Sequence, residues 1–520
     1  GYQFQRPVVV QKAKQQSTSM IPVKVDQTTL AEKGDQKKNN QMESPPALTV
    51  VPDCEPVPIN DQVALSNAIR EGIDALVGRY NKVFVHSRIS TSNLIMKLEL
   101  DDEYQQYAWK YMTFKDFREM LIHEQPIPIS EEEDNKGKKK VKFAPPAQVW
   151  LTSQNANFVP CSTFYPKLSE DWPPMHDGKL NFYRGFAVEP MLCTKADPDV
   201  KRWLYHMRTV VCRDDDVAYQ YLMNWFAHLI QKPWEKPQTA IILKGGQGTG
   251  KNVALKPLLR ILGVHGLYIE KPGAVSGKHN KIMENRTLVF ADEAAFHSEK
   301  DCGILRALIS ETSSSIEPKG IDAYNQRNFI RVIMATNSDH AIRFATDERR
   351  YVVLELSTCH KQDLEYFGKL VAAIDNGLAD KLLYLFQQRD ISQFLPMDIP
   401  QTGYLTEGKI NNLEPQQAFV YEALMYGSFI LNGGWASNTE TSAVRTWFQE
   451  WLDKKRIKFH GDIGRKLGKV ISKIGGTRKR TRTGNALSWE YYFKDLENSR
   501  NLFEENVLSG SVITWESKEA

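Results

Sequence analysis

The chain has 520 residues, of which 41% are hydrophobic and 25% are charged, a balance that excludes fibrous and membrane-embedded classes and fits a soluble globular protein. The length predicts roughly three domains, and no stretch reaches the ~18–20 apolar residues that would span a bilayer. The net charge of +4 hides an asymmetry, because residues 454–482 carry +11. Positive charge concentrated in this way usually has a polyanion as its partner. Six scattered cysteines without a C-x-x-C pair argue against a zinc site and against a disulfide framework.

The N-terminal third gives weak local signals. Residues 1–58 are rich in Gln, Lys, Ser, Asn and Pro without an apolar period, so we expect a mostly disordered arm. Apolar spacing predicts a helix over Asp61–Tyr80, and the charge block Glu131–Lys142 is typical of a solvated loop. Aromatic segments at Phe158–Tyr165 and Leu180–Val188 predict short strands.

Helical periodicity from Asp199 to Gln231 is followed by β-branched runs that alternate with helical stretches up to about Ser357, the pattern of a parallel α/β domain. Helices are expected again over Asp363–Gln388 and Pro415–Leu431, and an amphipathic helix, a basic helix and the aromatic strand Trp489–Phe493 follow. The predicted divisions are an arm (1–58), an α+β region (59–195), a helical collar (196–237), an α/β core (238–360), a helical extension (361–437) and a basic C-terminal domain (438–520).

A glycine-rich motif follows the apolar strand that begins at Ala240. It reads Gly-x-x-x-x-Gly-Lys and leads into a helical pattern, the context that a phosphate-binding loop requires. Backbone N–H groups and the helix N-terminus would surround the phosphates of ATP, and Lys251 would reach the β- and γ-phosphates. Asn252 stands where a hydroxyl residue is usual, and we expect its amide oxygen to ligate Mg²⁺ or to orient a metal-bound water. The predicted nucleotide-binding residues are Gly245, Gly246, Gln247, Gly248, Thr249, Gly250, Lys251 and Asn252.

Polar residues end two further apolar strands. Asp292 and Glu293 follow the strand that begins at Thr287, and we expect Asp292 to coordinate Mg²⁺ and Glu293 to polarise the attacking water. Asn337 ends the next strand and is expected to orient that water. The plainer alternatives stay open at this point: a strand-end cap for Asn337 and a structural turn for the glycine-rich motif.

Basic residues complete the set of candidates. Arg349 and Arg350 precede an apolar strand, where either one can stabilise phosphoryl charge, often across a subunit boundary, or form an ordinary surface salt bridge. Lys319 and Gly320 lie between two extended runs and predict a hairpin tip, at which Lys319 either holds a nucleic-acid phosphate or is simply solvated. Further contacts with DNA phosphates are expected from Arg478, Lys479, Arg480 and Arg482.

With these motifs in order, the sequence resembles superfamily 3 helicases, in particular the helicase half of phage, plasmid and poxvirus-type primase-helicases. The resemblance covers about residues 180–435 and implies an AAA+-like P-loop ATPase core with a parallel sheet, preceded by a collar region and followed by a small winged-helix-like domain. It also implies a hexameric ring around one DNA strand, 3′-to-5′ translocation, an arginine finger acting in trans and a strand-gripping hairpin that carries Lys319. The motifs that carry it are Asn224-Trp-Phe-Ala-His228, Ala291-Asp-Glu-Ala, Lys319-Gly-Ile-Asp-Ala, Ala335-Thr-Asn and Asp347-Glu-Arg-Arg.

Two residues depart from the family's pattern. Asn252 replaces the P-loop hydroxyl, and Pro257 lies within the first two turns of the following helix, where a proline is expected to kink it. Residues 1–180 contain no acidic motif of the kind that binds metal in a primase, and no zinc-ligand cluster.

The resulting hypothesis is an ATP-dependent DNA helicase that uses ATP and Mg²⁺ in the replication of a phage, virus or plasmid genome. Its expected partners are single-stranded or forked DNA, further copies of itself, and a primase or polymerase, in the cytoplasm of the host and without a membrane. Two alternatives remain. One is a genome-packaging or other DNA-translocating ATPase. The other is a non-catalytic origin-binding scaffold, which the departure of Asn252 from the P-loop pattern suggests.

Overall fold

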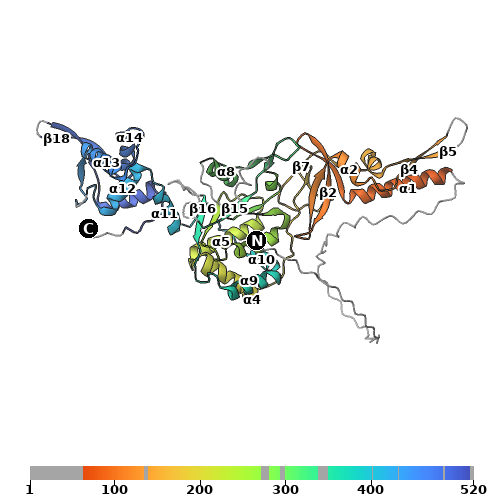
Figure 1. The fold of residues 1–520 in the computed structure, drawn as a ribbon, viewed down its shortest axis with the longest axis horizontal. Helices are drawn as coiled ribbons and strands as arrows, with labels where there is room; N and C mark the ends of the chain where they lie inside the picture. Colours follow the sequence, from red (N-terminus) through yellow and green to blue (C-terminus); the bar gives the residue numbers. More distant parts are fainter. Residues whose placement is uncertain are drawn as a thin grey trace, which may run out of the picture. The chain divides into compact units, whose positions relative to one another are not determined.

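The computed structural model describes residues 62–133, 139–270, 280–292, 299–337, 350–400, 402–430, 433–483 and 486–515 (Figure 1). The arm expected over residues 1–58 lies outside these ranges, as do the predicted catalytic residues Glu293 and Arg349. Within the described ranges, no helix is both long and apolar enough to cross a membrane.

A four-stranded sheet in the order β3-β2-β1-β6 organises the N-terminal part. Successive side chains of a strand point to opposite faces, so Ile95 packs in one core, whereas Leu94 and Met96 pack in another. Helix α1 begins at Gln62 and ends at Asn81, which confirms the predicted helix. The remaining bounds are β1 Phe84–Ile89, β2 Ser92–Asp101, β3 Gln106–Met112, β6 Phe158–Val159, α2 Phe114–Met120 and α3 Pro146–Thr152.

Residues 131–133 and 139–142 of the charge block lie on two paired strands, so the prediction of a solvated loop was wrong for these residues, and residues 134–138 lie outside the described ranges. Strand β4, Ile127–Glu133, pairs antiparallel with β5, Lys139–Ala144. Residues of opposite charge face each other across the two strands. Glu132, for example, lies opposite Lys140, and such pairs stabilise the pairing of strands. A solvated loop and a charged strand have the same composition, and only the cross-strand partner distinguishes them.

A small three-stranded sheet, in the order β7-β9-β8, follows this hairpin. Together with β6, it confirms strands in the two aromatic segments, although residues 182–188 lie outside any strand. The bounds are β7 Ser162–Thr163, β8 Met175–His176 and β9 Lys179–Asn181.

Two helices fill most of the stretch predicted to be helical after residue 199. Helix α4 spans Pro198–Tyr205 and α5 spans Asp216–Gln231, and a π-helical segment, His206–Val211, continues from the end of α4. The backbone then turns at Arg213 and Asp214, whose φ angles are 52° and 60°.

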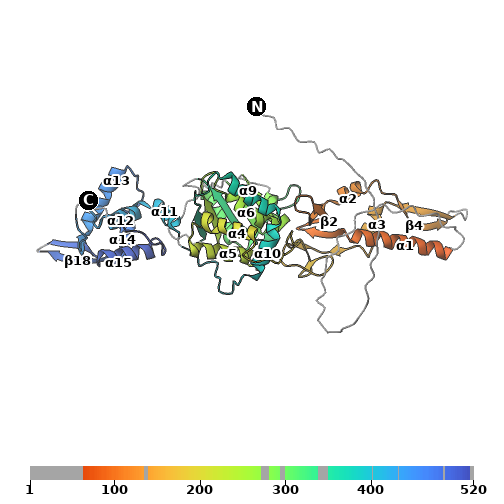
Figure 2. The ribbon, with the colours of Figure 1, turned by 90° about the horizontal axis from the view of Figure 1, so that it is seen from below.

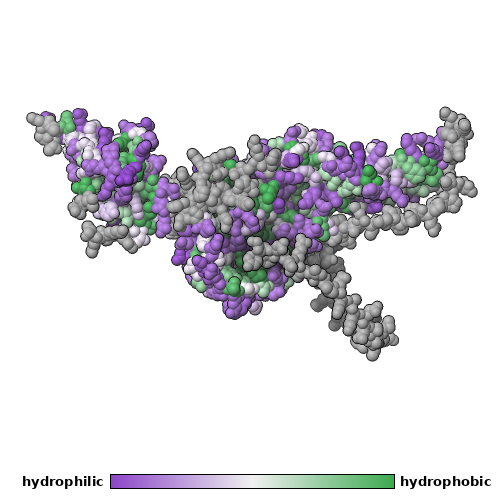
Figure 3. Space-filling model, in the orientation of Figure 1, coloured by the Kyte–Doolittle hydropathy of each residue, from purple (hydrophilic) through white to green (hydrophobic). Residues whose placement is uncertain are grey.

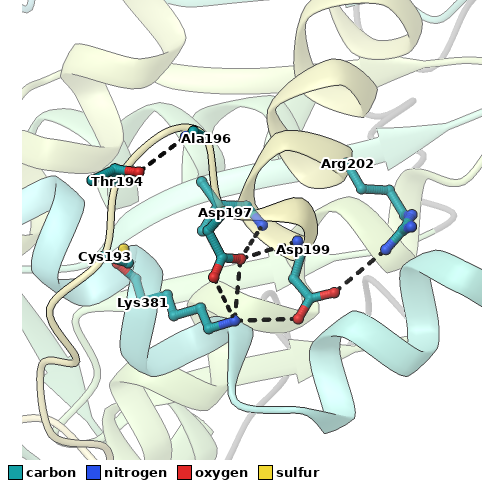
Figure 4. A network of polar contacts seen from close by, with 8 residues as sticks. Cys193, Thr194, Ala196, Asp197, Asp199, Arg202 and Lys381 are labelled. Carbon is teal, nitrogen blue, oxygen red and sulfur yellow. Dashed lines mark hydrogen bonds and ion pairs between the residues drawn. The ribbon is translucent and has the colours of Figure 1, made fainter.

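A network of polar contacts fixes the start of α4 against another helix (Figure 4). Asp197 caps α4 by accepting hydrogen bonds from the backbone N–H groups of Asp199 and Val200. The ammonium of Lys381, on α10 (Leu378–Gln388), lies 2.9 Å from a carboxylate oxygen of Asp197 and 3.2 Å from one of Asp199. The hydrogen bond to Asp197 raises the pKa of Lys381, so the lysine stays charged at neutral pH and holds the two helices together.

Five parallel strands form the central sheet, in the order β11-β12-β15-β10-β16, which confirms the predicted parallel α/β architecture. Nearly every side chain of its inner strands is buried, as expected for a parallel sheet covered on both faces. The bounds are β10 Ala240–Lys244, β11 Gly266–Ile269, β12 Leu288–Ala291, β15 Arg331–Thr336 and β16 Tyr351–Glu355.

Helices cover this sheet (Figures 1 and 2). Helices α4, α5, α6, α9 and α10 pack together, while α8 contacts β15 and lies in Figure 1 on the opposite side of β15 and β16 from α4, α9 and α10. Helix α6 continues through Pro257 as a single helix, so the proline does not interrupt it. The bounds are α6 Lys251–Leu262, α8 Glu299–Ser310 and α9 Leu364–Asp375, with 3₁₀ turns at Gly263–His265 and Asn280–Met283.

The C-terminal part has a core of its own, which includes Phe419, Phe448, Ile471 and Phe503. The amphipathic helix, the basic helix and the aromatic strand that the sequence predicts are α13, α14 and β19, and β19 is the middle strand of an antiparallel sheet in the order β17-β19-β18. Over α13 and α14 the visible face is largely hydrophilic (Figure 3). The bounds are α11 Gly403–Asn411, α12 Pro415–Tyr426, β17 Asn438–Glu440, α13 Thr441–Lys455, α14 Ile463–Lys473, β18 Thr477–Thr483, β19 Ala486–Tyr492 and α15 Leu496–Asn506.

Candidate active site

The glycine-rich loop, residues 245–250, joins the end of β10 to the start of α6. Gly248 and Gly250 have φ angles of 77° and 87°, a region that side-chain-bearing residues rarely adopt. A Cβ atom added to Gly250 would lie 2.5 Å from Cε1 of Phe367 and 2.7 Å from Cε1 of His206. The loop therefore needs glycine at this position both for its backbone conformation and for the close approach of its neighbours.

A cavity of about 320 Å³ lies at this loop. In a parallel sheet the carboxyl ends of the strands meet at one edge, and β15 lies between β10 and β12. The loop after β10, Asp292 after β12 and Asn337 after β15 therefore converge. The lining residues are Gly246, Gln247, Gly248, Thr249, Gly250, Lys251, Asn252, Val253, Asp292, Thr336 and Asn337, and Gly245 donates its N–H to the carbonyl of Thr336.

Lys251 begins α6 and is folded back over the loop. Its ammonium donates hydrogen bonds to the carbonyl oxygens of Gly245 and, at 3.0 Å, of Gly246. Thr249 donates its hydroxyl hydrogen to the same Gly246 carbonyl at 2.9 Å. The loop thus holds a positive charge beside the N-terminus of a helix, an arrangement that suits a phosphate group.

Asn252 and Asp292 are joined directly. The Nδ2 of Asn252 lies 2.6 Å from Oδ2 of Asp292 and 3.2 Å from the phenol oxygen of Tyr268. The hydroxyl of Tyr268, on β11, donates to the same Oδ2 at 3.0 Å. The nitrogen of Asn252 therefore faces the carboxylate, whereas the sequence suggested a role for its oxygen, either as a Mg²⁺ ligand or in orienting a metal-bound water. No sequence motif marks Tyr268, because it reaches Asp292 only through the pairing of β11 with β12.

His206 packs behind the loop. Its Nε2 lies 3.4 Å from the carbonyl oxygen of Gly250, and its Nδ1 lies 2.9 Å from the hydroxyl of Tyr366. Burial lowers the pKa of His206 to about 4, so the imidazole is neutral at pH 7. Because a carbonyl oxygen only accepts, Nε2 carries the hydrogen and Nδ1 accepts from Tyr366. Nothing in the sequence marks this histidine, since its partners lie 44 and 160 residues away.

Arg350 does not belong to the cavity of its own chain. It directly precedes β16, and its carbonyl accepts from the N–H of Ala240, the first residue of β10. The loop follows the last residue of β10, so the two lie at opposite edges of the sheet, about 15 Å apart along the strand. The guanidinium donates from Nε to the hydroxyl of Ser310 at 3.0 Å. Arg350 is thus not among the residues that line the cavity of its own chain, and its role in hydrolysis, at its own site or at a neighbour's, stays a prediction.

Lys319 lies in the loop that joins β13 (Ser313–Ile316) to β14 (Tyr324–Arg327), an antiparallel pair that confirms the predicted hairpin. The side chain of Lys319 is exposed. The loop itself is anchored, because Asp322 accepts a hydrogen bond from the hydroxyl of Thr91 at 2.9 Å.

The four basic residues predicted to contact DNA all lie on β18 and are exposed. The guanidinium of Arg478 lies 4.3 Å above the ring of Trp489, which is 42% exposed. Tyr491 and Phe493, by contrast, are buried in the C-terminal core, which favours packing over base stacking for both. The four residues are Arg478, Lys479, Arg480 and Arg482.

The residues that line the cavity offer one carboxylate together with amide and hydroxyl oxygens. This set of donors fits a nucleotide that carries Mg²⁺. Mg²⁺ typically takes one or two carboxylates and completes its shell with substrate phosphates and water. Among the described residues, no group of three or more His, Cys, Asp or Glu is arranged to hold a metal without such help. The donor set therefore favours a metal that arrives with phosphates over a permanent structural metal.

Comparison with known proteins gives partial matches. Residues 243–350 match a family of unknown function (DUF5906). The DNA primase-polymerase of Nitratiruptor phage NrS-1 is 20% identical over 203 residues, which are 38% of this chain and 28% of that protein, so the match spans less than a third of the relative's length.

Solved structures of the same phage protein share the fold of this chain. The apo C-terminal region of NrS-1 matches with a TM-score of 0.55 at 15% identity and covers 77% of this chain and 96% of that one. The A form of that region gives a TM-score of 0.53 at 14% identity, with 77% and 97% covered. At these identities, the likeness shows a shared mixed α/β fold with a parallel sheet.

Proposed function

We propose that the chain is an ATP-hydrolysing motor that unwinds DNA during the replication of a phage, virus or plasmid genome, as superfamily 3 helicases do. The observation that carries the proposal is the convergence of the glycine-rich loop, Lys251, Asp292 and Asn337 at one cavity. The strand, loop, lysine and helix N-terminus in succession are what the phosphates of ATP require. Likeness to a protein named as a DNA primase-polymerase supports the assignment to replication.

Each residue of the cavity then has a role in hydrolysis. The loop N–H groups and Lys251 bind the phosphates, and Asp292, with Asn252 beside it, would hold Mg²⁺, which neutralises phosphate charge when bound. Glu293 polarises the attacking water, and Asn337 orients it. Because Arg350 lies at the far edge of the sheet, it would serve the site of an adjacent subunit in a hexameric ring.

DNA is held by two further features. The succession α12-β17-α13-α14-β18-β19 fits a winged helix, in which β18 and β19 form the wing and the basic residues of β18 contact phosphates. Lys319, on its anchored hairpin, grips the single strand and couples hydrolysis to 3′-to-5′ movement.

ATP turnover and unwinding test the proposal together. We expect single-stranded DNA to stimulate ATP hydrolysis, and forked duplex to be unwound when it carries a 3′ tail. Lys251→Ala should abolish both activities without lowering the free energy of unfolding, since the side chain lies at the edge of the cavity. Lys256→Ala, an exposed lysine on the same helix, is the matched control and should behave as wild type.

Two other outcomes would replace the proposal. Absence of DNA-stimulated hydrolysis from correctly folded protein favours a scaffold. Stimulated hydrolysis that moves along duplex without separating its strands favours a packaging motor.

A further inference from the structure

The carboxylate of Asp292 is held by a closed triangle of hydrogen-bonding groups. Tyr268 and Asn252 each donate to Oδ2 of Asp292, at 3.0 and 2.6 Å, and the amide of Asn252 lies 3.2 Å from the phenol oxygen of Tyr268. The three residues come from three different elements, β11, the start of α6 and the end of β12. Two donors on one oxygen fix the rotation of the carboxylate about its last torsion.

The strand order of the sheet places Tyr268 there. Strands β11 and β12 pair in parallel with Tyr268 opposite Phe290, and the N–H of Asp292 donates to the carbonyl of Ile269 at 2.8 Å. Two backbone-paired strands therefore set the distance between the phenol and the carboxylate. Asn252 closes the triangle because its Nδ2 lies one bond farther from the backbone than the hydroxyl oxygen of a serine would.

We infer that Tyr268, with Asn252, is a positioning residue that orients Asp292 toward the divalent metal of the nucleotide site. The inference rests on the proposed function. It explains the unusual residue at the end of the glycine-rich loop, because Asn252 acts as a donor to the metal-binding carboxylate and not as a substitute for the missing hydroxyl ligand. Mg²⁺ demands near-ideal octahedral geometry, so an acid that tilts loses metal affinity.

The contacts of Tyr268 allow the positioning role of its hydroxyl to be tested apart from the packing of its ring. Its side chain is 39% exposed, and its ring meets that of Phe290 with centroids 5.4 Å apart. Tyr268→Phe keeps the ring and removes only the hydroxyl. Fold stability should therefore change little, while the carboxylate of Asp292 is left without the phenol donor.

The test measures metal binding without turnover. Mn²⁺ is titrated into the full chain in the presence of saturating ADP and followed by electron paramagnetic resonance, and ADP binding is measured separately in EDTA. We expect Tyr268→Phe to weaken Mn²⁺ binding about 10-fold, the usual scale for loss of an outer-shell partner, with metal-free ADP affinity and unfolding free energy unchanged. Asn252→Ser should act in the same direction, and the double variant should fall short of the sum of the two single effects, because both donors serve one oxygen.

Tyr104→Phe is the matched control. Tyr104 and Tyr268 line the same neighbouring cavity of about 510 Å³, and no contact of Tyr104 with Asp292 is among the hydrogen bonds of the described residues. Removal of the Tyr104 hydroxyl should leave Mn²⁺ affinity as in wild type.

The outcomes distinguish this inference from the proposal beneath it. Wild-type protein that binds neither ADP nor Mn²⁺ overturns the proposed function and the inference with it. Wild-type protein that binds both, alongside Tyr268→Phe with Mn²⁺ affinity within twofold of wild type, overturns the inference alone.

Discussion

Single residues at the glycine-rich loop act through close contact with groups far away in the sequence. The carbonyl of Gly250 accepts from His206, and a side chain at Gly250 would collide with both His206 and Phe367. The N–H of Gln362 donates to the carbonyl of Gly248 at 3.2 Å. The loop therefore owes its shape to the segment after β16 and to the π-helical segment after α4 as well as to its own glycines.

The buried imidazole of His206 predicts that the free energy of unfolding decreases at acid pH. Its pKa is lowered by burial to about 4, below the value of about 6.5 in an unfolded chain, so between these values the unfolded state binds more protons and stability falls as the pH drops. From pH 7 to pH 5 this histidine alone should cost about 2 kcal/mol of unfolding free energy.

Chemical denaturation at several pH values checks the size of this effect. Burial lowers the pKa values of His228 and His265 in the same direction, whereas it raises that of Glu284, which has the opposite effect on acid stability. Those groups remain in His206→Gln, so the difference from wild type isolates His206. An equal pH dependence in both proteins would contradict the assignment, and exposed His123→Gln should leave the pH dependence unaltered.

At the scale of elements, the basic strand β18 and the hairpin β13–β14 offer different kinds of contact. Strand β18 presents four exposed basic residues beside β19, in which Tyr491 is buried and Trp489 is exposed. The hairpin presents Lys319 on a loop that Asp322 fixes to Thr91. A charged strand suits affinity, whereas a single lysine on an anchored loop suits coupling between hydrolysis and movement.

Replacing the four basic residues of β18 with glutamine should weaken DNA binding and make it less sensitive to salt. The logarithm of the binding constant falls with the logarithm of the salt concentration, and each neutralised DNA phosphate adds ~0.7–0.9 to the magnitude of that slope. Loss of four such contacts should therefore lower the magnitude of the slope by about 3. Basal ATP turnover should survive. Filter binding at several salt concentrations measures the slope, and a slope equal to that of wild type would show that β18 does not contact DNA.

Lys319→Ala should uncouple the motor. Most DNA binding and DNA-stimulated ATP hydrolysis should remain, while unwinding of a forked duplex falls by at least about 10-fold, because one lysine contributes little affinity but is the contact that would move the strand. Lys319→Arg keeps the charge and should retain unwinding. If Lys319→Ala unwinds like wild type, the lysine is a solvated turn residue.

At the scale of the whole molecule, the position of Arg350 implies that an arginine finger at this residue would have to act on the site of a second subunit. The arginine lies at the edge of the parallel sheet opposite the glycine-rich loop, so no rearrangement of its side chain alone brings it to the loop of its own chain. A head-to-tail ring joins opposite edges of neighbouring subunits, and such heterologous contacts close when the rotation allows.

Mixing two inactive variants tests this arrangement. Lys251→Ala and Arg350→Ala should each lower ATP turnover by about 10³-fold or more. In an equal mixture, about one quarter of the interfaces would combine an intact Lys251 with a neighbour's intact Arg350, so activity should return to about that fraction. Mixed oligomers that form and remain inactive would contradict action across the interface. Lys256→Ala mixed with wild type controls for subunit exchange.

The sequence by itself determined the features whose chemistry is local. The strand before Gly245, the loop and the lysine after it lie within a dozen residues, and the polar ends of the strands before Asp292 and Asn337 follow from runs of apolar residues. Because parallel strands align their carboxyl ends, convergence at one edge could be predicted without coordinates.

Only the tertiary structure decided which neighbours each of these features has. The pairing of β11 with β12 brings Tyr268 to Asp292, and the π-helical segment after α4 brings His206 to Gly250. The cross-strand partners of residues 131–133 and 139–141 replace part of an expected loop with paired strands. Strand order and helix docking depend on the sum of many weak contacts over the whole core, and no short stretch of sequence encodes that sum.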